Sequence, residues 1–399
     1  MFGYYLRKIG NGLISLFIFI TILFFVAQVI IPHDFTTQFA LSMNRGLREE
    51  LQHQLGLDLP LWQQYLHWLG RLVSGGFGKS FYGYSISEML KSVIPPTLLI
   101  FLLGTILAFL IGLWLGKVTA WKGRGIFTGV TTFSAIALYT SFPPWLAFLM
   151  FYLFVRKLGI FPPILHENPL RALFGNYVKE ENITAAQIIN TILLTLLASA
   201  VIVWGANILI HKVFRKKIHP ILFFVLVVSL WVGSWFILGI DEIAIQIMRL
   251  AGVPLITYVF LSLGETMLIT QTAMRDTLHE EYIQTARAKG LPEAVIRNKH
   301  AARNAIIPVL SRLLVSLPYL LTGIVIIEKA VQWPGMGSTL FMALYQQDMP
   351  VVLAVLLIVG FVSLIARFIL EIISLVLDPR LRDRTFLAQQ EQNGLQQRA

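Results

Sequence analysis

The chain has 399 residues, of which 56% are hydrophobic and only 13% are charged, whereas soluble globular domains carry about 25% charged residues. This composition indicates a protein embedded in lipid and excludes an ordinary soluble domain. The formal net charge is +11, but the basic residues lie mainly in short loops between apolar segments, which argues against a nucleic-acid partner. Because the chain has no cysteine, it has no disulfide, thiolate metal site or cysteine nucleophile.

The apolar segments predict an all-α integral membrane protein. A helix rises ~1.5 Å per residue and needs about 20 apolar residues to cross a hydrocarbon core ~30 Å thick. We therefore expect about eight transmembrane helices, at 9–32, 96–118, 127–155, 186–210, 220–240, 252–273, 311–329 and 350–377. The first predicted helix comes directly after Arg7 and Lys8, as the apolar part of a signal peptide would. No small-residue cleavage site follows it, so we expect this helix to be retained.

The positive charges predict the orientation, because lysine and arginine are retained on the cytoplasmic side of the membrane. Arg7 and Lys8 place the N-terminus inside, and counting spans from there places every markedly basic loop but one inside as well. The inside segments are 119–126, 211–219, 274–310 and the tail after 377. Both termini are then cytoplasmic. The basic loop 156–185, counted as outward, fits this rule poorly.

One cytoplasmic segment, residues 276–308, is too polar to span a membrane and is rich in helix formers. Gly290 and Pro292 predict a turn in its middle, with a short helix at the membrane surface on either side. Its small residues allow close backbone approach and its basic residues supply charge for steering. These are Ala286, Ala288 and Gly290, and Arg287, Lys289 and Arg297. Docking of a soluble partner and a helix lying on lipid headgroups are equal alternatives on these residues alone.

Two runs in this segment, EYIQTARAKGL at 281–291 and HAARNAIIP at 300–308, resemble a known motif. They are similar to the cytoplasmic coupling loop of the permease subunits of dipeptide, oligopeptide and nickel ABC importers. Four further runs resemble that family: LGLDLPLWQQYLHWLGRLVSGGFGKSF at 55–81, EKAVQWPGMG at 328–337, DMP at 348–350 and DPRLR at 378–382. The resemblance implies an ABC importer type I permease-like helical bundle of the bacterial cytoplasmic (inner) membrane, forming half of a pore for peptides or similar solutes.

The resemblance also implies partners and a site. The cytoplasmic segment would insert into a groove of a separate ATPase and transmit its closure to the membrane helices. The residues implied to couple to the ATPase are Tyr282, Thr285, Ala286, Arg287, Ala288, Lys289, Gly290, Leu291, His300, Arg303, Asn304 and Pro308. The implied partners are a homologous second permease, two ATPases that use ATP and Mg, and an external solute-binding protein. This chain would itself be no enzyme and would bind no cofactor, metal or nucleic acid.

This sequence departs from the family pattern at three places. Gln284 stands where the wider superfamily often has glutamate, and Gly76 stands where the peptide family usually has aspartate. The spans at 186–240 have no counterpart in the usual six-span plan. The implied division is 1–32 (tail and first helix), 33–95 (small external domain), 96–155 (helices two and three), 156–250 (insertion with two extra helices), 251–380 (core permease region) and 381–399 (cytoplasmic tail).

Charged residues inside a membrane cost roughly 2.5–3.5 kcal/mol each, so each needs a reason. Arg367 and Glu371 are four apart on span eight and are expected to pair with each other. Glu265 has no partner in its own helix, so it either faces the translocation cavity or bonds to a neighbouring helix. Glu328 suits a gate or a packing role equally well. The candidate pore or gate residues are Glu265, Glu328, Trp333, Pro334 and Gly335.

Two rival functions find less support. A self-sufficient secondary transporter needs intramembrane ion sites and usually inverted repeats, and a membrane-embedded enzyme needs acids, bases or metal ligands at one depth. The carboxylates are scattered, and the histidines lack metal-ligand spacing. Gly78, Lys79 and Ser80 are similar to the end of a phosphate-binding loop, but Val73 stands where the first glycine is needed.

Overall fold

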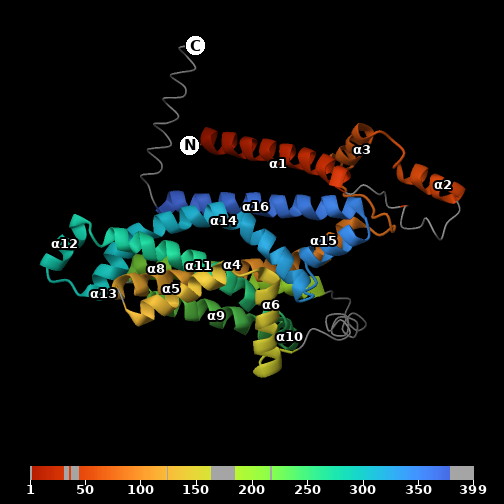
Figure 1. Ribbon diagram of the computed structural model, residues 1–399. Helices are drawn as coiled ribbons and strands as arrows, with labels where there is room; N and C mark the ends of the chain where they lie inside the picture. The colour runs from red at the N-terminus through yellow and green to blue at the C-terminus, as the bar shows by residue number, and fades with distance from the viewer. Residues whose placement is uncertain are drawn as a thin grey trace, which may run out of the picture.

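The computed structural model describes residues 2–30, 36, 45–123, 125–162, 185–215 and 218–377. Within these ranges every regular element is a helix, which confirms the all-α fold. The long helices run side by side as an elongated bundle, with α12 (Glu281–Ala288) at one end and α3 (Leu61–Val73) at the other (Figure 1). The predicted tail 381–399 and the family-like run at 378–382 lie outside the described residues.

Five described helices contain an apolar stretch long enough to cross a membrane. They are α1 (Phe2–Ile30), α4 (Ile86–Lys122), α8 (Ala185–Phe214), α11 (Gly252–Thr277) and α16 (Met349–Leu377). Helix α9 (Pro220–Ile237) is equally apolar but shorter, and α14 (Ala302–Ala330) encloses the predicted span 311–329, part of whose side chains lies outside the described set. Figure 1 shows α1 beginning and α16 ending toward the end of the bundle that carries α12, as a topology with both termini cytoplasmic requires.

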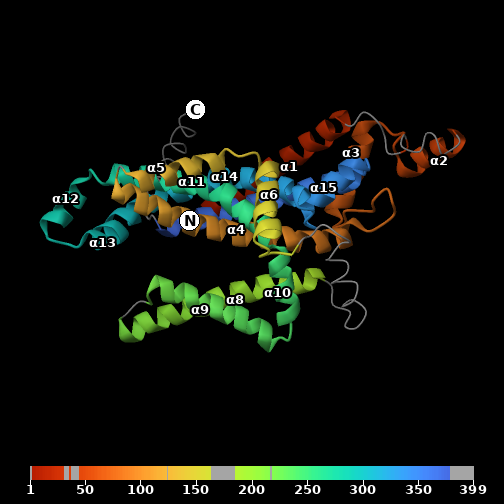
Figure 2. The ribbon, with the colours of Figure 1, turned by 60° about the horizontal axis from the view of Figure 1, so that its bottom comes forward.

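The span predicted at 127–155 is not one straight helix. It is divided into α5 (Ile126–Tyr139) and α6 (Pro143–Phe151), which continues as the π-helical η2 (Tyr152–Lys157); the two parts meet at 113°. The reason is that α6 begins with two prolines, which lack the N–H needed to continue a helix and force the preceding residue into an extended conformation. In both views α6 lies across the bundle rather than along it (Figure 2). This pair is the sixth candidate span only if its two parts are counted together.

Helix α11 forms the centre of the bundle, and α4 packs against it through glycines. A Cβ added at Gly104 would lie 2.2 Å from the Tyr258 ring, and one at Gly116 would lie 2.5 Å from Thr270 Cβ. Membrane helices use such small residues to bring their backbones close together. In contrast, α1 lies at the edge: 11% of its membrane-length segment is buried, against 72% for α11.

The external end is held together by a buried carboxylate. Asp348, just before α16, accepts hydrogen bonds from the Ser80 hydroxyl, from the Phe81 N–H at 3.2 Å and from the Tyr84 hydroxyl at 3.3 Å. The loop after α3 is thereby joined to the start of α16, 268 residues further along the chain. Helix α4 already begins at Ile86, inside the segment assigned to the external domain. The other external helices are α2 (Arg45–Leu55) and α15 (Met336–Tyr345).

The two helices of the predicted insertion form a hairpin beside the bundle. Figure 2 shows α8 and α9 set apart from the other long helices, with α10 (Asp241–Leu250) leading back to α11. The hairpin is stabilised by Trp231, whose indole N–H donates to the Ile192 carbonyl at 2.8 Å. Arg367 is exposed, and the side chain of Glu371 lies outside the described residues, so their expected pairing stays a prediction.

Candidate functional site

The cytoplasmic segment is attached to the bundle by one face of α12. Ile283 and Ala286 are buried, and they pack in one cluster with Met274 of α11 and with Ile296 and Ala305. The remaining residues of α12 are exposed. The helix is therefore held firmly on one side and presents its other side outward.

Gly290 ends α12. Its φ is +70°, and its N–H donates to the Arg287 carbonyl at 2.9 Å, while the Leu291 N–H donates to the Ala286 carbonyl at 3.3 Å. This pair of bonds is the Schellman motif, which needs a left-handed residue at its turn. Any residue with a Cβ is strained there, so glycine fixes the point at which the chain reverses.

After Pro292 the chain does not form the separate short helix that the sequence predicts. Helix α13 (Glu293–Val295) continues through the π-helical η3 (Ile296–Ala301) directly into α14. The reason is visible in the sequence, because no glycine or proline interrupts residues 293–307. π-Helical turns occur frequently at functional sites. The helix that leaves the cytoplasmic segment is thus the same helix that enters the membrane.

Two side chains of α12, Tyr282 and Arg287, connect it to its surroundings. Asn304 of α14 donates to the Tyr282 hydroxyl at 2.8 Å. Arg287 donates to Glu293 at 3.0 Å, and its guanidinium lies 5.7 Å from the ring centre of Trp121 in α4. Both side chains tie α12 to helices that enter the membrane. Arg287, expected from sequence to offer its charge to a partner, is therefore engaged within the chain.

The structure places most of the predicted coupling residues on the outside of this segment. The exposed ones are Tyr282, Thr285, Arg287, Ala288, Lys289, Gly290, Leu291, Arg303, Asn304 and Pro308. His300 is half-buried, and Ala286 is only 5% exposed. The small side chain of Ala286 therefore allows close packing of α12 within the chain and not, as expected, close approach by a partner.

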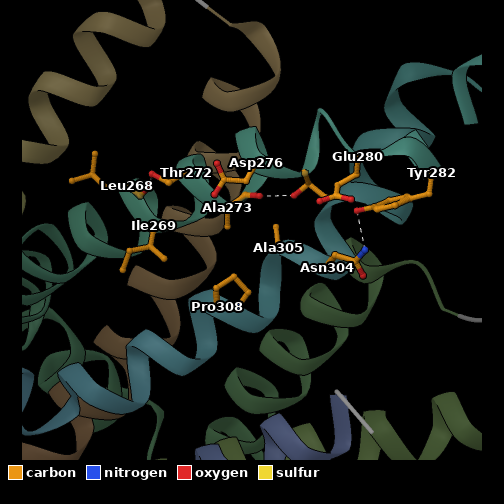
Figure 3. A pocket seen from close by; sticks show the side chains of 11 residues that line it. Leu268, Ile269, Thr272, Ala273, Asp276, Glu280, Tyr282, Asn304, Ala305 and Pro308 are labelled. Atoms are coloured by element: carbon orange, nitrogen blue, oxygen red, sulfur yellow. Dashed lines mark hydrogen bonds between the residues drawn. The ribbon is translucent and has the colours of Figure 1, made fainter. Parts of the chain in front are cut away.

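A pocket of about 820 Å³ lies where α11, α12 and α14 separate at the cytoplasmic end. Its polar lining includes Asp276 and Glu280, and its apolar lining includes Leu268 and Ile269. Figure 3 shows the Tyr282–Asn304 hydrogen bond at the end of this pocket nearest α12. The pocket lies beside the cluster in which Ile283 of α12 and Ala305 of α14 pack on Met274 of α11.

Glu265 bonds to a neighbouring helix, which was the second alternative that the sequence left open. Its Oε1 accepts a hydrogen bond from Arg312 Nε of α14 at 2.8 Å. Glu265 itself is 9% exposed, whereas the Arg312 side chain is 51% exposed. A role of Glu265 in the pore stays a prediction. Arg312 is not among the residues predicted for the site, and the local signal for it was a cation at the start of the predicted span 311–329.

Glu328 and the run after it, residues 328–337 (the outer turn), form a buried junction. Glu328 Oε2 accepts from the Gly337 N–H at 2.6 Å, and a Cβ on Gly335 would lie 2.2 Å from Glu328 Oε1. The Trp333 indole donates to the Pro96 carbonyl at 3.2 Å, and Pro334 is half-buried. These contacts join α14, α15 and α4. They are packing contacts, and a gating role for Glu328, Trp333, Pro334 or Gly335 stays a prediction.

Among the residues that the structure describes, no group of three or more histidines and carboxylates is placed to hold a metal ion. The main features of the described residues are instead α12, which is packed on one face, the continuous helix from α13 into α14, and the buried outer turn.

Comparison with known proteins identifies this arrangement. Residues 108–383 match the family described as binding-protein-dependent transport system inner membrane component. The dipeptide transport system permease protein of Lactococcus lactis is 26% identical over 96% of this chain and 100% of its own length. The di/tripeptide permease protein of Pseudomonas aeruginosa is 29% identical (96% and 99%), and the oligopeptide permease protein of Bacillus subtilis is 28% identical (91% and 94%). The chain therefore belongs to the family of inner-membrane components of binding-protein-dependent transport systems, the permeases of ABC importers in the bacterial cytoplasmic membrane.

Proposed function

We propose that this permease forms half of a translocation pore for peptides. A homologous second permease forms the other half, an external solute-binding protein delivers the peptide, and two separate ATPases hydrolyse ATP with Mg. The peptide substrate is supported by the relatives, whose names are those of dipeptide, di/tripeptide and oligopeptide permeases. In this scheme the chain binds no nucleotide itself.

The observation that carries the mechanism is the unbroken helix from the cytoplasmic segment into α14. When the ATPases close, they push on the exposed face of α12. Ile283 and Ile296 are packed in one cluster, and Arg287 is bonded to Glu293, so α12 cannot move without moving the start of that helix. The push therefore reaches the membrane as a displacement of α14.

Helix α14 passes the displacement to α11. The Arg312–Glu265 pair joins these two helices further into the membrane, and at their cytoplasmic ends Met274 and Ala305 pack in one cluster beside the pocket. Coupling requires contacts that differ between two states. We infer that the pocket closes or opens as α12 moves, while the ion pair acts as the fixed point between α11 and α14.

Purification of the chain in mild detergent, followed by reconstitution, tests this function. We expect ATPase subunits to co-purify and to drive uptake of a labelled dipeptide in the presence of the binding protein. A chain that purifies without an ATPase and accumulates peptide on an ion gradient would be a secondary transporter. Efflux of the same peptide from vesicles lacking ATP serves as the control for leakage.

A further inference from the structure

The inserted hairpin packs on the bundle through only half of its length. Near the external end, Ile189 and Leu193 of α8 share one buried cluster with Leu99 and Leu103 of α4. Figure 2 shows α8 diverging from the bundle toward its cytoplasmic end. The contact between the two helices is therefore confined to the outer half of the membrane.

The faces that meet in the outer half continue toward the cytoplasm as apolar stripes. Both stripes run with the same helical spacing, of four, three, four and four residues. On α4 the stripe is Leu99, Leu103, Ile106, Leu110 and Trp114; on α8 it is Ile189, Leu193, Leu196, Ala200 and Trp204. Leu103 and Leu193 are 8% and 7% exposed, whereas Trp114 and Trp204 are 57% and 60% exposed. Both stripes thus lose their protein partner toward the cytoplasmic leaflet.

A tryptophan ends each stripe on the cytoplasmic side. Trp114 and Trp204 each lie fifteen residues after the buried start of their stripe, at Leu99 and Ile189. At ~1.5 Å rise per residue, each indole lies about 22 Å along its helix from that buried start. Tryptophan is enriched where acyl chains meet headgroups. The uncovered parts of the stripes therefore end at the inner headgroup level.

Basic residues follow both tryptophans on the cytoplasmic side. Lys117 continues the stripe of α4, and Lys212 and Arg215 are exposed at the tip of the hairpin. In the described part of the chain none of the three is paired with an acid, and the sequence has no aspartate or glutamate from 182 to 240. Clusters of lysine and arginine directly cytoplasmic of a membrane helix attract anionic lipid headgroups.

We propose that the hairpin binds an anionic phospholipid of the cytoplasmic leaflet. Its acyl chains lie against the uncovered part of the α8 stripe, and its phosphate lies at Lys212 and Arg215 at the tip of the hairpin. A neutral lipid would cover the apolar stripe but would leave the basic side chains without a counter-charge. A helix of another protein would cover the stripe, but its binding would not depend on the basic side chains. The charge therefore selects the occupant. This inference is independent of the transported solute.

The test uses the full-length chain in phosphatidylcholine vesicles. Brominated phosphatidylglycerol or brominated phosphatidylcholine is titrated in, and the quenching of Trp204 is obtained as the difference between wild type and Trp204→Phe. We expect phosphatidylglycerol to reach half-maximal quenching at a roughly tenfold lower mole fraction, since basic residues near the membrane surface attract its charged headgroup. Lys212→Gln combined with Arg215→Gln should remove most of this preference.

The charge-matched control combines Arg156→Gln with Lys157→Gln at the other side of the membrane, and it should keep the preference. Equal curves for the two lipids in the wild type would show ordinary lipid contact and overturn the proposal. Absence of Trp204-dependent quenching by either lipid would show that protein covers the stripe, and would overturn it as well. Both decisive comparisons use only wild type and one conservative variant, so they do not depend on the charge variants folding.

Discussion

The cytoplasmic segment and the outer turn look alike as sequences but differ as structures. Each is a short run that resembles the permease family, and each depends on a glycine. Gly290 ends α12 in open space with a positive φ, whereas Gly335 has ordinary extended backbone and lies against the Glu328 carboxylate. The first glycine is needed for backbone conformation and the second for space.

The same contrast separates their side chains. Trp333 and Glu328 of the outer turn are fully buried, whereas Tyr282 and Thr285 of α12, and Lys289 directly after it, are exposed. A family-like motif therefore marks a position that the fold or the mechanism requires, and exposure distinguishes the two. The outer turn holds three helices together, and α12 has an exposed face, which we propose the ATPase contacts. The variants below are ways to break or sharpen this contrast.

The largest effect is expected for Gly335→Ala. The new methyl group would overlap the buried Glu328 carboxylate, and overpacking of a filled core typically costs about 1–3 kcal/mol. We expect a clear drop in thermal stability, measured on the detergent-purified chain by fluorescence-detected size exclusion after heating. The control is Gly129→Ala in α5, where nothing lies within 4 Å of the added Cβ. Equal stability of the two variants would contradict the packing role of the outer turn.

Compared with Gly335→Ala, Gly290→Ala should lower the stability less and the coupling between the ATPases and the membrane helices more. Alanine in a left-handed conformation costs about 1–2 kcal/mol, which is concentrated at the end of α12. We expect normal membrane insertion but reduced solute-stimulated ATP hydrolysis in the complex with the ATPases. Gly290→Asn is the matched control, because asparagine tolerates this conformation, and it should retain more stimulation. If alanine and asparagine behave alike, backbone conformation at this turn does not control coupling.

Much of this arrangement could be predicted from the sequence. Apolar length and loop charge predicted the long helices, and Gly290 with Pro292 predicted the end of α12. Contacts between distant segments could not be predicted in this way. Nothing local indicates that Asp348 accepts from Ser80, or that Arg312 lies beside Glu265. The bend after Tyr139 had a local signal, the Pro143–Pro144 pair, but the apolar run over 127–155 concealed it.

A smaller effect separates the two basic residues at the C-terminal end of α12, Arg287 and Lys289. Arg287 is bonded to Glu293, while Lys289 is exposed and has no ion-pair partner in the described part of the chain. We expect Lys289→Gln to weaken binding of the ATPase and to reduce its salt dependence, measured by titrating the ATPase onto the reconstituted permease. Arg287→Gln removes an exposed pair worth about 0.2–1 kcal/mol and should change the salt dependence less. The reverse order would mean that Arg287 leaves Glu293 to contact the ATPase.

The smallest effect is expected for Tyr282→Phe. The substitution removes the hydroxyl that accepts from Asn304 but keeps the ring, and such a hydrogen bond contributes about 0.5–1.5 kcal/mol. Because the bond connects α12 to α14, its loss should lower the peptide uptake obtained per ATP hydrolysed, while ATPase binding stays unchanged. Measuring both quantities separates this variant from Lys289→Gln, which should lower binding at an unchanged ratio. If Tyr282→Phe weakened binding instead, Tyr282 would belong to the surface that the ATPase contacts, and α12 would be connected to α14 chiefly through Ile283, Ile296 and the Arg287–Glu293 pair.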